Sequence, residues 1–199
     1  MQQQNHKKPL QKKTANKAAV ISNEKNKEIW MNKKVHYLLF FLLAFLLYGW
    51  TYNFDYSVDD KFILSTIYNT ENTFAGFVSL FKTWFAGADY RPISFVTFWL
   101  ERYIAGVPNP HISHIVNVFL FACILCKVYD FIIVSRLYAD SKTLVLLAIL
   151  SCFIFAIHPN HVSVVANIKA RDNLLSMLFG LFAAIQLIYY FDTVYYYSF

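Results

Sequence analysis

The apolar residues of this chain fall in long, continuous blocks separated by polar segments. Four blocks are candidates for helices that cross a membrane, and they cover residues 35–52, 114–135, 143–157 and 173–191. An α-helix rises about 1.5 Å per residue, so roughly 20 residues cross a hydrocarbon core about 30 Å thick. The third block is short for such a span. The pattern therefore predicts about four transmembrane helices.

The segment between the first two blocks has a different periodicity. Between residues 74 and 85 the apolar positions recur at i, i+3, i+4 and i+7, while Ser79, Lys82 and Thr83 fall on the opposite face. This spacing predicts an amphipathic helix lying in the membrane interface. A helix packed on the spans is the alternative. A second short helix is predicted from Pro92 to the turn that begins at Gly106.

Composition supports a membrane protein and argues against a soluble domain. Apolar residues make up 57% of the 199 positions and charged residues only 15%. Because the apolar residues are also blocked together, we predict an all-α membrane protein with an outer loop that contains interfacial amphipathic helices.

Charge sets the expected orientation. Residues 1–34 carry nine lysines and two acids, whereas residues 53–110 carry six acids and four bases. Positive segments stay in the cytoplasm, so residues 1–34 are predicted to be a disordered cytoplasmic tail and residues 35–199 the membrane region. The net charge of +6 suits anionic lipid. A nucleic-acid partner is not expected, because no aromatic or arginine-rich pattern accompanies the lysines.

Polar residues inside the second block are expected to make internal contacts. His114 and Asn117 share one helix face, which predicts hydrogen bonds to a neighbouring helix. Lys127 and Asp130 are three residues apart, which predicts an ion pair within the span. Charged residues inside a membrane are also candidates for function.

Several short motifs occur in a fixed order along the chain. Asp59 and Asp60 follow the first block, a Tyr-Arg-Pro segment contains Arg91, an H-x-x-N motif opens the second block, and "HPNHVSVVANIKARDNLL" begins at His158. Together they resemble the GT-C membrane glycosyltransferases, and most closely the protein O-mannosyltransferase-like branch that often carries tetratricopeptide repeats. The resemblance covers about residues 35–191.

This resemblance implies a specific activity. Such enzymes transfer a sugar from a polyprenyl-phosphate donor to a protein or glycan acceptor on the outer or lumenal face of the membrane. The implied location is the bacterial inner membrane or the endoplasmic reticulum, with the N-terminus in the cytoplasm. Family members continue with further helices, so the chain is expected to correspond to the N-terminal part of such an enzyme.

Two positions depart from the family pattern. The family often has Glu two residues after the second His of the long motif, where this chain has Ser163. After Arg171 the family commonly has a further acid, and here only Asp172 is present, followed by Asn173. A lost carboxylate would weaken acid–base chemistry or metal binding.

The implied reaction needs a base for the acceptor hydroxyl and cations for the leaving phosphate. Asp59 or Asp60 is predicted to be the base, and the other to position the acceptor or bind a metal. Helix capping or a solvated surface is the alternative for both. Arg91, Lys169 and Arg171 are predicted to meet the donor phosphate, with ordinary snorkelling at the interface as the alternative.

Three further residues are candidates for acceptor or metal binding: Asp172, His158 and His161. Asp172 precedes the fourth block and would otherwise cap its helix. The two histidines have no obvious third ligand, which favours structural hydrogen bonding over zinc. A divalent metal is left open.

Two other functional classes remain as alternatives. A non-catalytic fragment or accessory subunit would keep the same fold without activity. A transporter fits less well, because the charged residues gather outside the membrane and not at its midplane.

Overall fold

The computed structural model describes residues 32–84, 89–135 and 141–197. The predicted tail therefore lies almost entirely outside the described residues. The described residues divide into two units, one that ends at Leu38 and one that begins at Leu39. In the first unit, the Lys33 ammonium lies 5.2 Å from the centre of the Tyr37 ring. All packing described below is within the second unit.

The apolar blocks form helices, as predicted. The long elements are α2 (Lys33–Tyr48), which continues into the 3-10 helix η1 (Gly49–Asn53), α6 (Pro110–Val134), α7 (Ser141–Ile157) and α9 (Arg171–Tyr197). Among the described residues, three segments are long and apolar enough to cross a membrane: Lys33–Asn53, Pro110–Val134 and Ile168–Thr193. The apolar helix α7 is shorter, as the third block indicated. The described part of the chain is thus an all-α membrane protein.

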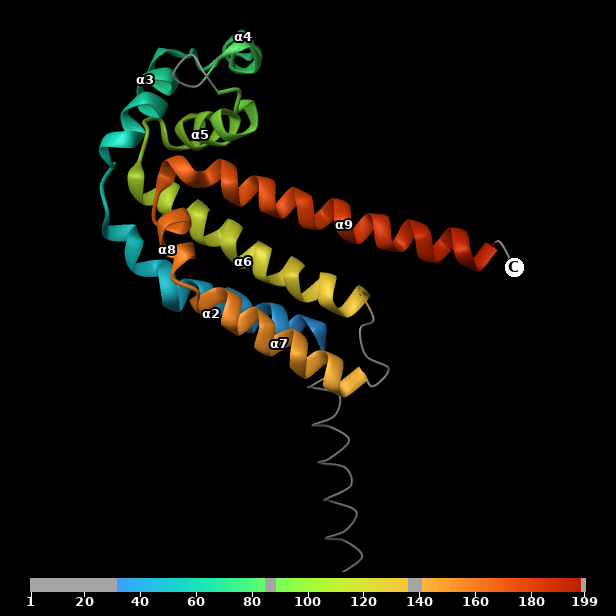
Figure 1. Cartoon of the computed structure of the whole chain (residues 1–199). Helices are drawn as coiled ribbons and strands as arrows, with labels where there is room; N and C mark the ends of the chain where they lie inside the picture. The colour runs from blue at the N-terminus through green and yellow to red at the C-terminus, as the bar shows by residue number, and fades with distance from the viewer. Residues whose placement is uncertain (1–31, 85–88, 136–140, 198–199) are drawn as a thin grey trace, which may run out of the picture. The chain divides into compact units, whose positions relative to one another are not determined.

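Helix α6 is the central element of the second unit. It packs against α9 on one side and against α7 and η1 on the other (Figure 1). The Tyr48 ring contacts Phe121 of α6 edge-on at 5.1 Å, and the Tyr48 hydroxyl donates to the carbonyl oxygen of Ala156 at 3.0 Å. Inside α6, Lys127 Nζ lies 2.9 Å from Asp130 Oδ2, which confirms the predicted ion pair.

A group of short helices connects η1 to α6. These elements are η2 (Val58–Asp60), α3 (Lys61–Asn69), α4 (Phe74–Ser79), η3 (Leu80–Lys82) and α5 (Pro92–Ala105). Their apolar side chains form a compact core that also includes Ile168 of the later 3-10 helix η4 (Ile168–Ala170). This core attaches the connecting helices to the turn immediately before α9.

The helix predicted from residue 92 is confirmed as α5. Pro92 occupies its first turn, where the missing N–H has no helical partner to lose. Gly106 ends it with a φ of 81°, a left-handed conformation that glycine adopts without a Cβ penalty.

The amphipathic segment is shorter than the periodicity predicted. Helix α4 ends at Ser79, and a 3-10 turn follows. The side chain of Leu80 is fully buried and Phe77 contacts Trp99 at 5.6 Å, so this face packs on α5. Phe74, whose ring stacks on Phe77 with the centroids 6.2 Å apart, is 80% exposed. Contact of that exposed face with a membrane interface stays a prediction.

Candidate functional site

The acidic pair lies in the short 3-10 helix η2, and its two carboxylates have different environments. Asp60 is 2% exposed. Its Oδ2 accepts from the backbone N–H of Ser57 at 2.7 Å and from the Ser57 hydroxyl at 2.8 Å. This reciprocal capping box satisfies N–H groups that have no partner within the helix. The capping alternative therefore describes Asp60 well.

Asp59 points outward from the same turn. Its side chain is 60% exposed, and its Oδ2 lies 3.5 Å from Nζ of Lys169, which is itself 33% exposed. An ion pair that is this exposed contributes only ~0–1 kcal/mol to stability. Asp59 is thus the accessible carboxylate of the pair, and an ammonium group lies beside it.

The second oxygen of Asp60 reaches across to η4. Its Oδ1 accepts from the backbone N–H of Lys169 at 3.0 Å, and the same N–H is 3.1 Å from Oδ1 of Asn167, the N-cap of η4. Residues 109 positions apart in the sequence are joined in this way. The structure therefore brings Asp59, Asp60 and Lys169 together.

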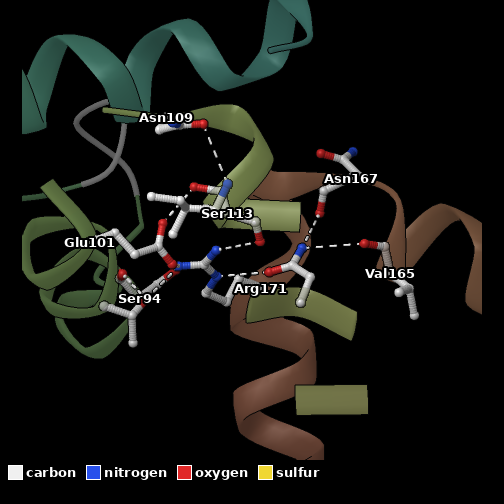
Figure 2. Close-up of polar contacts among 10 residues, drawn as sticks. Ser94, Glu101, Asn109, Ser113, Val165, Asn167 and Arg171 are labelled. Carbon is white, nitrogen blue, oxygen red and sulfur yellow. Dashed lines mark hydrogen bonds and ion pairs between the residues drawn. The ribbon is translucent and has the colours of Figure 1, made fainter. Parts of the chain in front are cut away.

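Arg171 is fully buried at the start of α9, and its guanidinium is surrounded by protein groups (Figure 2). Its Nη1 forms an ion pair with Glu101 and donates to the Thr97 hydroxyl at 3.1 Å. Its Nη2 donates to the carbonyl oxygen of Ser113 at 2.9 Å. The planar guanidinium also lies 3.9 Å from the centre of the Phe98 ring.

Asn117 of α6 completes this buried cluster. Its Oδ1 accepts from Arg171 Nε at 2.8 Å, and its Nδ2 donates to the carbonyl oxygens of Asn167 at 3.1 Å and Val165 at 3.4 Å (Figure 2). The predicted hydrogen bond to a neighbouring helix is confirmed for Asn117. His114 is equally buried, but its ring nitrogens have no hydrogen-bond partner within the described residues; its ring lies edge-on to Phe54 at 6.0 Å.

Arg91 and Asp172 form a third connection to the same segment. Arg91 Nη1 lies 2.7 Å from Asp172 Oδ2, and Arg91 Nη2 lies 2.6 Å from Asp89 Oδ2. Asp172 stands in the first turn of α9, where a negative charge is favoured by the helix dipole. Asp172 is therefore the second residue of α9, in its first turn, and not the N-cap that the sequence offered as the alternative.

His158 precedes helix α8 (Asn160–Val165) and its Nδ1 accepts from the backbone N–H of Asn160 at 3.3 Å, whereas His161 lies within α8 and packs with aromatic rings. Their ring centres are 5.9 Å apart, and the His161 ring lies 4.2 Å from Phe155. Burial, and secondarily the proximity of His158, lowers the pKa of His161. Within residues 32–84, 89–135 and 141–197, no group of three or more His, Cys, Asp or Glu side chains could hold a metal ion. The metal hypothesis for these histidines gains no third ligand.

Sequence reasoning missed Glu101 and Ser113. Glu101 is the mostly buried acid that faces Arg171, with a side chain 12% exposed, and it also accepts from the Ser113 hydroxyl. The signal was present, because Glu101 is the sole acid in the largely apolar run "PISFVTFWLERYIA". An acid in such a run needs a partner when it is buried.

One short segment, residues 169–172, thus collects contacts from η2, α5, α6 and the residue that precedes α5. Lys169 meets Asp59 and Asp60, Arg171 meets α5 and α6, and Asp172 meets Arg91. Chemically, the arrangement offers the accessible carboxylate of Asp59 and two partly exposed cations, Lys169 and Arg91, which three separate segments bring to the start of α9. Such groups suit proton abstraction and the binding of an anion.

Comparison with known proteins gives one consistent group of relatives. A 99-residue segment is 32% identical to the protein O-mannosyl-transferase TMTC4 of Mus musculus and covers 46% of this chain. The human protein O-mannosyl-transferases TMTC1 and TMTC3 are 34% and 33% identical over 94 residues, or 47% of this chain. No family model matches, and no solved structure matches.

The matches cover only a small part of these relatives. The matched segment is 13% of TMTC4, 10% of TMTC1 and 9% of TMTC3. The similarity therefore concerns a limited region of much longer proteins. Within that region, the chain is similar to protein O-mannosyl-transferases, which confirms the family resemblance indicated by its motifs.

Proposed function

We propose that this protein acts in glycosyl transfer, moving a sugar from a polyprenyl-phosphate donor to an acceptor hydroxyl on the outer or lumenal face of the membrane. The names of the relatives suggest a mannosyl group and a protein acceptor. The observation that carries the proposal is the pairing of the exposed carboxylate of Asp59 with the ammonium of Lys169 beside membrane-spanning helices.

In the proposed reaction Asp59 is the general base. Its carboxylate takes the proton of the acceptor hydroxyl while the acceptor oxygen forms a bond to the anomeric carbon of the sugar. The bond between that carbon and the phosphate oxygen breaks, and polyprenyl phosphate leaves with the electron pair. A base placed in this way contributes typically 10²–10⁴-fold to the rate.

The donor phosphate is proposed to lie near Lys169 and Arg91. Both side chains are partly exposed, at 33% and 27%, and each now faces a carboxylate that an anionic ligand would replace. Arg91 has a planar fork that suits a phosphate, whereas Lys169 acts as a point charge. The guanidinium of Arg171 is held by Glu101 and its neighbours, so we assign Arg171 an indirect part in donor binding.

Asp172 and the histidine pair are proposed to act at the edges of the site. Asp172 orients Arg91 through their 2.7 Å ion pair. His158 is exposed and remains available for an acceptor, while His161 packs among aromatic rings. The proposal requires no metal. A divalent ion coordinated by the donor phosphate is compatible with it.

The test compares two exposed aspartates of one segment in the full-length protein reconstituted in nanodiscs. Polyprenyl-phosphate mannose and a serine- or threonine-containing peptide serve as substrates, and transfer of radiolabelled sugar is measured. Asp59→Asn should reduce transfer by ~10²-fold or more, because the amide cannot accept the proton. Asp55→Asn, four residues earlier and also exposed, should transfer at the parent rate.

Two results would contradict the proposal. If Asp59→Asn and Asp55→Asn both transfer sugar at the parent rate, Asp59 is not the base. If the parent protein inserts normally but transfers no sugar while polyprenyl phosphate still binds, the non-catalytic accessory role is favoured instead.

A further inference from the structure

We propose that Asp60 is a positioning residue, and not a second catalytic carboxylate. Its two oxygens join η2 to η4, and we call these contacts to Ser57 and Lys169 the Asp60 clamp. The clamp holds Asp59 opposite Lys169. The catalytic meaning of this arrangement rests on the proposed function, but the clamp itself can be tested without any activity.

The hydrogen bonds of Asp60 require an acceptor at both oxygens. Oδ2 receives the N–H and the hydroxyl of Ser57, and Oδ1 receives the N–H of Lys169. An ionised carboxylate is the side chain that accepts at both positions. In Asp60→Asn an amide NH₂ replaces one oxygen, so a donor would face a donor on one side of the clamp.

The residues of the Asp60 clamp are next to, or the same as, the residues proposed to react. Asp59 directly precedes Asp60, and Lys169 is the residue whose backbone N–H the clamp holds. The separation of the Asp59 carboxylate and the Lys169 ammonium is therefore set by this one carboxylate, and not by the long segment between the two turns. The distance of 3.5 Å between Asp59 Oδ2 and Lys169 Nζ is the observable consequence.

The far end of η4 is held independently. Two residues after Lys169, the buried guanidinium of Arg171 is fixed by Glu101 and Asn117. Asn117 also binds the carbonyl oxygen of Asn167, at the beginning of η4. The turn η4, which carries Lys169, is thus held by α5 and α6. The Asp60 clamp then holds η2, which carries Asp59, against it.

Burial argues against Asp60 as a base. A general base must come within about 2.6–3.2 Å of the proton that it removes. Asp60 is 2% exposed and would have to release its backbone donors to reach an acceptor, whereas the Asp59 side chain is 60% exposed. Asp59 is therefore accessible to an acceptor, whereas Asp60 is buried and holds η2 to η4.

The first experiment uses the unmodified chain in nanodiscs. A soluble carbodiimide activates accessible carboxylates, which then couple to an added amine or form a direct amide with a contacting lysine; mass spectrometry locates the products. The clamp predicts modification of Asp59 and an Asp59–Lys169 cross-link, with Asp60 protected. Modification of Asp60 as readily as Asp59 would overturn the clamp.

The second experiment repeats the cross-linking in two variants. Asp60→Asn should lose most of the Asp59–Lys169 cross-link, because the two turns are no longer held in register. The matched control Asp55→Asn removes an exposed carboxylate from the same segment and should keep the cross-link. A cross-link at the parent level in a folded Asp60→Asn protein would overturn the proposal; if this variant fails to insert, the footprint of the unmodified chain still decides.

Activity measurements separate the clamp from the proposed function. A displacement of about 1 Å costs up to ~10²-fold in rate, so Asp60→Asn should lower kcat. The loss should be smaller than in Asp59→Asn, because Asp60→Asn keeps the base and only displaces it. A larger loss in a folded Asp60→Asn protein than in Asp59→Asn would make Asp60 the base. Absence of transfer with an intact cross-link pattern would reject the proposed function alone.

Discussion

Replacing Arg171 by methionine should strongly destabilise the protein. Methionine keeps an unbranched apolar side chain of comparable length but removes all the N–H donors of the guanidinium. The Glu101 carboxylate then keeps its charge in a site where it is only 12% exposed. Asn117 Oδ1 and the carbonyl oxygen of Ser113 each lose a donor as well.

The size of the effect follows from burial. Removing one member of a buried ion pair costs about 3–5 kcal/mol, because the remaining charge is left without a partner. The loss of the guanidinium over the Phe98 ring acts in the same direction. We therefore expect the free energy of unfolding to fall by about 3–5 kcal/mol. Arg171→Lys should recover little of it, since an ammonium cannot reproduce the fork.

Unfolding in mixed micelles with increasing denaturing detergent, followed by tryptophan fluorescence, measures this change. Arg91→Met is the matched control, because Arg91 is also paired with acids but is 27% exposed. That pair should contribute only ~0–1 kcal/mol. A double-mutant cycle with Glu101→Gln should give a coupling energy of about 1–3 kcal/mol.

A small effect would refute this reasoning. If Arg171→Met unfolds within about 1 kcal/mol of the parent, the buried cluster does not support the site. If that variant is stable and binds polyprenyl phosphate weakly, Arg171 would return to the direct phosphate contact that the sequence suggested.

Two further predictions concern other parts of the structure. A Cβ at Gly76 would overlap the backbone carbonyl of Glu71, so Gly76→Ala should lower the free energy of unfolding by about 1–3 kcal/mol. The control Gly180→Ala, where the added Cβ meets open space, should not. Equal unfolding midpoints for the two variants would contradict this. The pKa of His161 lies below its ordinary 6.5, so the unfolded chain takes up a proton first as the pH falls. Stability should therefore decrease below about pH 6.5, and His161→Phe should remove that part of the decrease; an unchanged pH dependence in this variant would count against it.

The sequence alone determined the membrane architecture. Continuous apolar blocks are sufficient to place helices, because a bilayer demands length and low polarity and every backbone group must be paired within the segment. The helix from Pro92 was also readable, since proline and glycine mark its two ends by their own backbone restrictions. The length of α4 could not be read from the sequence. Leu80 packs on α5 in a 3-10 turn, and the regular helix with its apolar face ends before this residue.

The sequence identified the residues of the candidate site but not the role of each one. Asp59 and Asp60 are identical and adjacent in sequence, and the only local difference is the capping-box spacing from Ser57 to Asp60. The sequence likewise does not distinguish the roles of the three cations Arg91, Lys169 and Arg171. Their motif indicated a common site, yet it carried no information on which of them would be buried.

Only the tertiary structure separated these residues. Asp60 and Arg171 are buried because elements far apart in the sequence close over them and supply hydrogen-bond partners. The turn at Lys169 does so for Asp60, in addition to its local partner Ser57, and α5 and α6 do so for Arg171. Asp59 is left at the surface, one residue away. Burial and partner supply depend on contacts across 109 residues for Asp60 and 70 for the Arg171–Glu101 pair, and a local sequence pattern cannot encode them.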